Sequence, residues 1–345
     1  MNDVFCRIDG HVGRITLNRP DVLNALTHEM CLAIEAALDE WRDSVRLVII
    51  EAAGNKAFCA GGDIASLYES AQRGDIAYGR KFWQDEYRLN AKLAEYPVPI
   101  VSFLQGFVMG GGVGLGCHTS NRIVCESTKI AMPECGIGLL PDVGGSLLLA
   151  NAPGFLGRYL GLTGARMGPG DAIFAGFADT FIAYEQWDQL KSALVQTGDI
   201  AEIAHFASTA PASAMANDLA TIDRYFGADT LNEIAANLQD SDTEFAQRAL
   251  KGLLRGAPLA LSCCLAVLKT LRGTHSLRDA LALEFRFTAR AVAQGDFPEG
   301  IRAAIIDKDN APNWAHAAIS DVTPSEVDAM LSDLGSEALN LETVL

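Results

Sequence analysis

The amino-acid sequence predicts an α/β core followed by a helical C-terminal region. Short β-branched runs alternate with segments of helical periodicity over residues 1–183, and this alternation is typical of layered α/β folds. Ala-, Leu- and Gln-rich helical patterns then dominate residues 184–293. The sequence shows no internal repeat of fixed period. We therefore divide the chain into a core, residues 1–190, and a helical region, residues 191–345.

The individual elements follow from the spacing of apolar residues. Two alternating runs, Val4–Asp9 and Val12–Leu17, flank the turn signal Gly10-His11 and predict a hairpin. Apolar residues recur at helical spacing over His28–Trp41 and predict a helix there. Further strands are predicted at Arg46–Glu51, Pro99–Leu104 and Arg122–Cys125, and further helices through Leu67 and Tyr68, at Phe82–Tyr96 and at Gly112–His118.

The charge of the chain excludes several classes of partner. Lys and Arg number 27 against 43 Asp and Glu, a formal net charge of −16. A surface this acidic disfavours nucleic acids and anionic membranes, and an anionic ligand would need local cations or backbone N–H groups. The uncharged stretch 96–121 is broken by Pro97, Pro99 and the glycines from Gly106 to Gly116. It is therefore predicted as buried core rather than as a membrane span.

The cysteines and histidines predict no metal site. The eight cysteines contain no C-x-x-C and no regular spacing, and the six histidines are scattered. The first ten residues include Asp3, Arg7 and Asp9, where a secretory segment would need an apolar run. We expect reduced thiols and a cytoplasmic location.

Two glycine-rich segments follow predicted strands. Residues 56–63 (KAFCAGGD) come after the strand RLVIIE, and residues 105–115 (QGFVMGGGVGL) come after the strand PIVSFL. At such strand-to-helix turns, free N–H groups and the positive helix end point towards a ligand. Two facing turns would supply two donors to one oxyanion. Taken separately, each segment is also compatible with a tight packing turn.

A third segment carries two carboxylates in an almost wholly apolar sequence. Residues 131–145 (AMPECGIGLLPDVGG) contain Glu134 and Asp142. Buried carboxylates are costly unless they are paired or used, so the pattern favours acid–base or nucleophilic chemistry. A helix cap at one acid and an ion pair at the other would explain the spacing equally well.

Together these segments resemble the crotonase (enoyl-CoA hydratase/isomerase) superfamily, and most closely its 3-hydroxyisobutyryl-CoA hydrolase branch. The resemblance covers nearly the whole chain, and the string from Met132 to Gly145 is its most branch-specific part. The remaining matching motifs are LNRP with LNAL at 17–26, FCAGGD at 58–63, MGGG at 109–112, DFPEGIRA at 296–303 and IDKD at 306–309.

The resemblance implies a crotonase-like spiral of ββα units with a helical C-terminal region that partly covers the site. It also implies that the N–H groups of Gly62 and Gly111 form an oxyanion hole. Glu134 would attack the thioester carbonyl or activate a water, and Asp142 would position the acyl hydroxyl or that water. Glu86 matches a substrate-contacting glutamate, although a solvated helix position is the commoner fate of such a residue. Contacts with CoA are implied at Leu23, Lys56, Ala60 and Asp63.

The sequence departs from the hydratase pattern at two positions. Hydratases of this superfamily use two glutamates, and this chain keeps the one that matches Glu134 but has Gly114 in place of the other. Where hydratases commonly have glycine, the chain has Asp142. A carboxylate is thus lost from one wall of the implied site and gained on another, which disfavours alkene hydration and favours thioester hydrolysis.

The resemblance therefore implies hydrolysis of a short β-hydroxyacyl-CoA, such as 3-hydroxyisobutyryl-CoA of valine breakdown. An enoyl-CoA hydratase or isomerase that uses Glu134 alone is the alternative enzyme, and a non-catalytic acyl-CoA-binding protein is the alternative from another class. We expect no metal or redox cofactor, because the sequence has no Cys/His cluster and no nucleotide fingerprint, and CoA enters as part of the substrate. Acyl-CoA is the expected partner, nucleic acid and membrane are not, and a homo-oligomer is left open.

Overall fold

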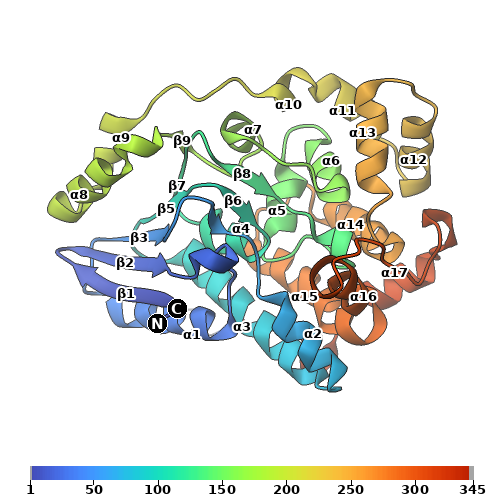
Figure 1. Cartoon of the computed structure of the whole chain (residues 1–345), viewed down its shortest axis with the longest axis horizontal. Helices are drawn as coiled ribbons and strands as arrows, with labels where there is room; N and C mark the ends of the chain where they lie inside the picture. The colour runs from blue at the N-terminus through green and yellow to red at the C-terminus, as the bar shows by residue number, and fades with distance from the viewer. Residues whose placement is uncertain (1, 342–345) are drawn as a thin grey trace.

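The computed structural model describes residues 2–341, and Figure 1 shows their arrangement. Residues 1 and 342–345, the outer ends of the two predicted parts of the chain, lie outside the described residues. The predicted division between residues 190 and 191 falls within helix α8, Trp187–Thr197.

The larger sheet has six strands. The predicted hairpin is present with its predicted bounds as β1, Val4–Asp9, and β2, Val12–Leu17, paired antiparallel. From β2 onwards all neighbours are parallel. The strand order is β1-β2-β3-β5-β7-β9, with β3 at Leu47–Ala52, β5 at Ile100–Leu104, β7 at Asn121–Val124 and β9 at Thr180–Phe181.

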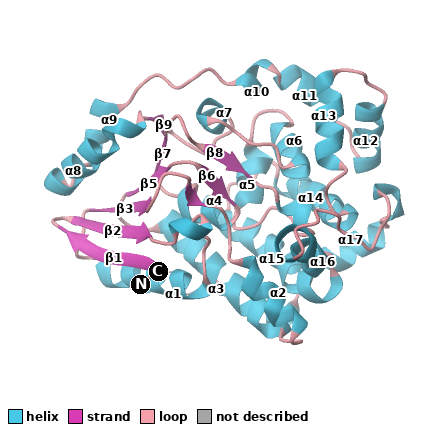
Figure 2. Ribbon diagram, in the orientation of Figure 1, coloured by secondary structure: helices cyan, strands magenta, loops and turns pink. Residues whose placement is uncertain are grey.

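A second, three-stranded sheet lies beside the first (Figure 2). Its strands are β4, Ala57–Cys59, β6, Phe107–Met109, and β8, Lys129–Ala131, all parallel. Each follows one strand of the large sheet along the chain and precedes a helical segment. The chain therefore winds through successive ββα units, and the predicted crotonase-like spiral is confirmed.

These three short strands are absent from the sequence-based prediction, which assigns their residues to loops and glycine turns. Each strand has only three residues, too few to establish an alternating pattern. Helix α3 also differs from its prediction: it begins at Ile76 rather than Phe82 and ends at Glu95. The earlier start is explained by Asp75, whose side chain caps the helix by accepting from the amide of Tyr78 at 3.2 Å.

Helices from both parts of the chain pack around the two sheets (Figure 2). The core helices besides α3 and α8 are α1, His28–Trp41, α2, Ile64–Gln72, α4, Gly111–Gly116, α5, Gly145–Asn151, α6, Leu156–Thr163, and α7, Pro169–Phe174. The later helices are α9, Ile203–Phe206, α10, Ala214–Asn217, α11, Leu219–Phe226, α12, Leu231–Gln239, α13, Glu244–Leu253, α14, Pro258–Leu271, α15, Leu277–Gln294, α16, Phe297–Ile301, and α17, Pro324–Leu331.

The main hydrophobic core is shared by the two parts of the chain. Helix α15 packs on α3, and α14 packs on α5. The rings of Tyr87 and Phe285 meet edge to face across the first of these contacts, with centroids 6.1 Å apart. The helical region is therefore built into the core that carries the predicted site.

No single helix within residues 2–341 is both long enough and apolar enough to cross a membrane. Helices α13 and α14, bent by 108° at their junction, meet those criteria of length and composition only when they are joined.

A smaller core cluster covers the other face of the large sheet. Helix α8 supplies Trp187, which is 2% exposed, stacks edge to face on Phe103 at 5.2 Å and donates its indole N–H to the carbonyl of Ile182 at 3.0 Å. Its neighbour Tyr184 is 45% exposed. Leu190 and Leu194 of the same helix are also buried in this cluster, and Trp187 is the largest side chain through which α8 packs on the sheet.

Replacing Trp187 by Ala is expected to lower the free energy of unfolding by about 3–5 kcal/mol, the usual cost of deleting a buried aromatic ring. Urea denaturation of the variant, with Tyr184→Ala as the exposed aromatic control on the same segment, measures this. A Trp187→Ala midpoint equal to that of the control would contradict the role assigned to Trp187.

Candidate active site

The candidate site lies at the carboxyl edge of the three-stranded sheet. Because β4, β6 and β8 are parallel, the segments that follow them emerge at the same edge. These segments carry Gly61-Gly62, Gly110-Gly111 and Glu134 respectively. The register of three short strands thus brings together the three motifs that the sequence analysis singled out.

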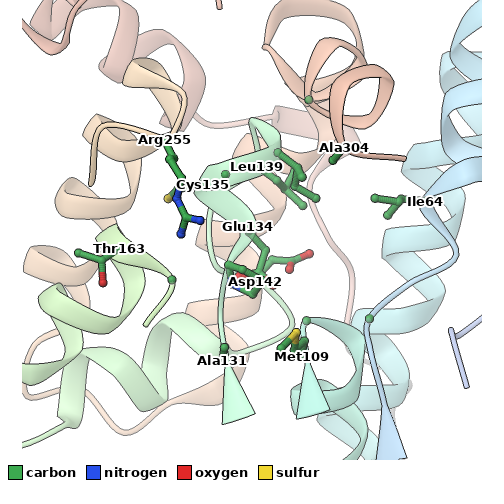
Figure 3. A pocket seen from close by; sticks show the side chains of 18 of the residues that line it. Ile64, Met109, Ala131, Glu134, Cys135, Leu139, Asp142, Thr163, Arg255 and Ala304 are labelled. Carbon is green, nitrogen blue, oxygen red and sulfur yellow. The ribbon is translucent and has the colours of Figure 1, made fainter. Parts of the chain in front are cut away.

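A cavity of about 1370 Å³ opens at this edge. Figure 3 shows Glu134 and Asp142 near its centre, with Met109 and Ala131 at the ends of their strands below. Its described lining includes all five residues predicted for catalysis, the oxyanion hole and substrate contact, namely Gly62, Glu86, Gly111, Glu134 and Asp142.

The backbone amides of Gly62 and Gly111 are both available to a ligand. In the bridge between Leu26 and Gly62, the amide of Leu26 donates to the carbonyl of Gly61 at 2.9 Å, and the amide of Asp63 donates to the carbonyl of Leu26 at 2.8 Å. The N–H of Gly62 is not used by this bridge. Gly111 opens helix α4, so its N–H has no acceptor within the helix.

The two amides lie close together. A Cβ atom placed on Gly111 would be 3.3 Å from the nitrogen of Gly62 and 2.7 Å from Oε1 of Glu86. Glycine is therefore required at position 111, because a side chain there would collide with the Glu86 carboxyl group and crowd the amide of Gly62.

Glu134 is 5% exposed and begins a short 3-10 turn, Glu134–Ile137, directly after β8. A Cβ atom on Gly110 would lie 3.1 Å from its Oε1, and its Oε2 has no hydrogen-bond partner among the described residues. Burial, and secondarily the nearby Asp142, raise the pKa of Glu134 well above its ordinary value. A buried carboxyl group that lines a cavity and has one oxygen without a partner is a candidate nucleophile or base.

Asp142 is 4% exposed and lies in the turn before α5. Its Oδ2 accepts a hydrogen bond of 2.8 Å from the hydroxyl of Tyr87 on α3. Burial raises the pKa of Asp142 to about 7, and the Tyr87 hydrogen bond opposes that rise. The ionisation of this carboxyl group therefore depends on the balance between its burial and the Tyr87 hydroxyl.

Glu86, also on α3, is 3% exposed and its Oε1 has no partner among the described residues. Burial and the proximity of Asp142 raise the pKa of Glu86 well above its ordinary value. The solvated alternative considered for this residue is therefore wrong. The carboxyl group faces the same cavity as Glu134, which leaves it free to contact a ligand.

The turn around Asp142 is held by residues that the sequence analysis did not identify. Val143 adopts a left-handed φ of 53°, and its carbonyl accepts a 2.9 Å hydrogen bond from Nε2 of His118. Burial lowers the pKa of His118 to about 4, so the ring is neutral and carries its proton on the nitrogen that faces the carbonyl. The amide of Gly144 donates to Oε2 of Glu284 at 2.8 Å.

Glu284 comes from α15 and is fully buried. It accepts from the amide of Ser146 at 3.2 Å and from the Ser146 hydroxyl. Burial raises the pKa of Glu284 to about 8, although these hydrogen bonds lower it. A lone acid among Ala280, Leu281 and Phe285 on a helical face was the sequence signal that could have identified it.

Gly114, which replaces the second glutamate of the hydratase pattern, has no room for a side chain. A Cβ atom there would lie 2.7 Å from Nδ2 of Asn90 and 2.8 Å from Cβ of Val143. Asn90 is fully buried, and neither of its amide atoms has a partner within residues 2–341. The wall on which hydratases carry their second acid is here filled by Asn90 and Val143.

The four residues predicted to contact CoA are only partly brought together. Leu23 lies beside Ala60, whose amide donates to its carbonyl at 3.1 Å, and of the four only Ala60 lines the cavity. Lys56 is exposed at the opposite end of β4. Asp63 pairs with Arg19 at 3.0 Å. These contacts stay predictions.

Within residues 2–341, no group of three or more His, Cys, Asp or Glu side chains is arranged to hold a metal ion. The eight cysteines, all within that range, are free thiols.

Comparison with known proteins agrees with this site. The enoyl-CoA hydratase/isomerase family model matches residues 12–331. The chain belongs to this family. It is 36% identical to the mitochondrial 3-hydroxyisobutyryl-CoA hydrolase of Danio rerio, over 96% of this chain and 90% of that protein. It is 35% identical to the protein of the same name from Homo sapiens, over 98% and 90%.

Two solved structures share the whole fold. An enoyl-CoA hydratase from Rhodobacter sphaeroides 2.4.1 is 53% identical, with a TM-score of 0.95, over 98% of this chain and 100% of the other. A carnitinyl-CoA dehydratase from Mycobacterium thermoresistibile is 40% identical, also with a TM-score of 0.95, over 99% and 100%. The names of the relatives and of the structures thus point to two different reactions on one scaffold.

Replacing Tyr87 by Phe is expected to raise the pKa of Asp142 above about 7, because the hydroxyl donates to the ionised carboxylate and favours it. The 13C carboxyl resonance of Asp142, assigned by its loss in Asp142→Asn, measures the titration. Tyr184→Phe, at an exposed tyrosine, is the control. A titration midpoint in Tyr87→Phe that is unchanged or lower would contradict this interpretation of the hydrogen bond.

Proposed function

We propose that this protein hydrolyses 3-hydroxyisobutyryl-CoA, or a closely similar short β-hydroxyacyl-CoA, to the free hydroxy acid and CoA. The single observation that carries the proposal is the buried pair Glu134 and Asp142, which lines the same cavity as the two available backbone amides. At Gly114, where the hydratase pattern has its second glutamate, the neighbouring side chains leave no room for a side chain. The relatives named 3-hydroxyisobutyryl-CoA hydrolase, aligned over nearly the whole chain, support it.

The geometry supports a simple division of roles. The thioester oxygen would lie between the N–H groups of Gly62 and Gly111, which stabilise the charge that develops on it; one such donor is typically worth roughly 3–4 kcal/mol in the transition state. Glu134 would attack the carbonyl carbon and expel the CoA thiolate, leaving an anhydride for water to cleave, or would deprotonate a water that attacks instead.

Both routes need Glu134 in its ionised form. Since burial and the neighbouring Asp142 raise its pKa, ionisation is harder at low pH and the rate of hydrolysis should rise with pH. The binding energy of the CoA portion would offset the cost of holding a charged carboxylate in this cavity.

Asp142 is suited to recognise the β-hydroxyl of the acyl group. Its Oδ2 accepts from Tyr87, and the carboxyl group lines the cavity, where it would accept a hydrogen bond from a substrate hydroxyl or from the hydrolytic water. Glu86, on the far side of the oxyanion hole, would contact the acyl group.

Alkene hydration is the second candidate, because the structure with 53% identity carries an enoyl-CoA hydratase title. Free thiol release from 3-hydroxyisobutyryl-CoA, followed with a thiol reagent, separates the two reactions, since hydration of an enoyl-CoA releases no thiol. A protein that only binds acyl-CoA would catalyse neither.

Two further features complete the proposal. We expect catalysis without a metal or redox cofactor, because all the roles above fall to protein side chains and amides. We also expect a reducing, cytoplasmic environment for the eight free thiols. The mitochondrial location in the names of the vertebrate relatives applies to those proteins.

Replacing Glu134 by Gln is expected to reduce thiol release by at least ~10²-fold, since an essential nucleophile or base is lost, while CoA-ester binding is retained. Steady-state turnover and calorimetric binding measure the two effects. Glu244→Gln, at a side chain that is 94% exposed, is the control. Turnover above about a tenth of the wild-type value in Glu134→Gln would remove Glu134 from the chemical step.

Replacing Asp142 by Gly is expected to reduce kcat/KM far more on 3-hydroxyisobutyryl-CoA than on isobutyryl-CoA, because a site built for a hydroxyl discriminates by up to ~10⁴-fold. The kcat/KM values on the two esters and the melting temperature are measured together. Equal losses in a destabilised variant would show that Asp142 only braces its turn. Equal losses at unchanged stability would place Asp142 in the chemical step instead.

A further inference from the structure

All the cations that line the cavity within residues 2–341 lie in two neighbouring segments. They are Arg166, just after α6, and Arg248, Lys251 and Arg255 on and after α13. We call these four residues the cationic side. Figure 3 shows Arg255 and Thr163 on one side of Glu134 and Asp142, and Ile64 and Ala304 on the other. In this view Arg255 therefore lies across the catalytic acids from Ile64.

Local packing fixes the segment of Lys251 and Arg255 close to the loop that carries Glu134. A Cβ atom on Gly252 would lie 3.0 Å from Cβ of Thr163, so glycine lets α13 approach the end of α6 closely. The amide of Ala257, two residues after Arg255, donates to the carbonyl of Cys135 at 2.9 Å. Cys135 directly follows Glu134, so the loop that carries Arg255 is tied to the loop that carries the nucleophile.

The four cations differ in whether they already have an interaction partner in the protein. Arg248 pairs with exposed Glu244 at 3.3 Å, and Arg166 lies over the ring of Phe107 at 5.5 Å. Lys251 and Arg255 have no acidic partner among the described residues. Two exposed cations at a cavity wall are therefore free to bind an anion, in a chain whose formal net charge is −16.

The reaction creates such an anion at this place. Under the proposed function, on which this inference rests, a neutral acyl thioester becomes a carboxylate between Glu86, Glu134 and Asp142. None of these three acids has a cationic partner within the described part of the chain, so the new carboxylate is repelled by any of them that is ionised. The nearest compensating charges on the cavity wall are those of the cationic side.

We propose that the cationic side is a product site: Lys251 and Arg255 bind the carboxylate of the released hydroxy acid and guide it out across the α6–α13 wall. The ligand is a small carboxylate, recognised by charge-assisted hydrogen bonds from the ammonium and guanidinium groups.

The test uses the double variant Lys251→Gln/Arg255→Gln. Its matched control is Lys269→Gln/Arg272→Gln, which removes the same two charges from the end of α14, outside the cavity lining. Inhibition of thiol release by 3-hydroxyisobutyrate and by CoA is measured separately. Calorimetric binding of 3-hydroxyisobutyrate and of its neutral amide provides a readout that needs no turnover.

The expected result is a rise of about tenfold in the inhibition and dissociation constants of 3-hydroxyisobutyrate. The constants for CoA and for the neutral amide, and the KM of the CoA ester, should change less than twofold. A larger change for CoA than for the acid would assign these cations to its phosphates and overturn the proposal. Equal constants in variant and control would overturn it as well.

Failure of the proposed function gives a different result. If the wild-type protein releases no thiol from 3-hydroxyisobutyryl-CoA, the function is wrong, whereas calorimetry still reports whether the cationic side binds the carboxylate.

Discussion

Four carboxyl groups, those of Glu86, Glu134, Asp142 and Glu284, are buried together, and none has a cationic partner among residues 2–341. Desolvation raises the pKa of each one. The hydrogen bonds that these acids accept come from neutral donors. The hydroxyl of Tyr87 donates to Asp142, and the amide of Gly144 and the hydroxyl of Ser146 donate to Glu284. These neutral donors bind Asp142 and Glu284, while Oε2 of Glu134 is left without a partner and is available for the reaction.

This constraint explains why the helical region cannot be separated from the site. Glu284 and Thr288 both lie on α15. Glu284 accepts hydrogen bonds from the amides of Gly144 and Ser146. The hydroxyl oxygen of Thr288 lies 3.4 Å from that of Tyr87. The Asp142 turn is thus supported from both sides by helices α3 and α15, which pack on each other. The turn owes its geometry to residues about 140 positions further along the chain.

The sequence predicted what local patterns encode. The hairpin and helix α1 were predicted with their observed bounds, because alternation and helical spacing extend over six or more residues there. Glu134 and Asp142 were found because acids are conspicuous in an apolar string. Strands β4, β6 and β8 were missed because three residues carry no period. Glu284, His118 and Asn90 were missed because their roles depend on tertiary contacts between distant segments.

Val143 shows what this arrangement demands of the backbone. A β-branched residue with φ of 53° is in a conformation that valine rarely adopts, at a typical cost of order 1–3 kcal/mol. Glycine would relieve that strain. It would also remove the side chain that, with Asn90, closes the wall at Gly114. The same strained valine follows Asp142 directly and fills the wall at Gly114, so selection for a more relaxed backbone at this residue would work against the shape of that wall.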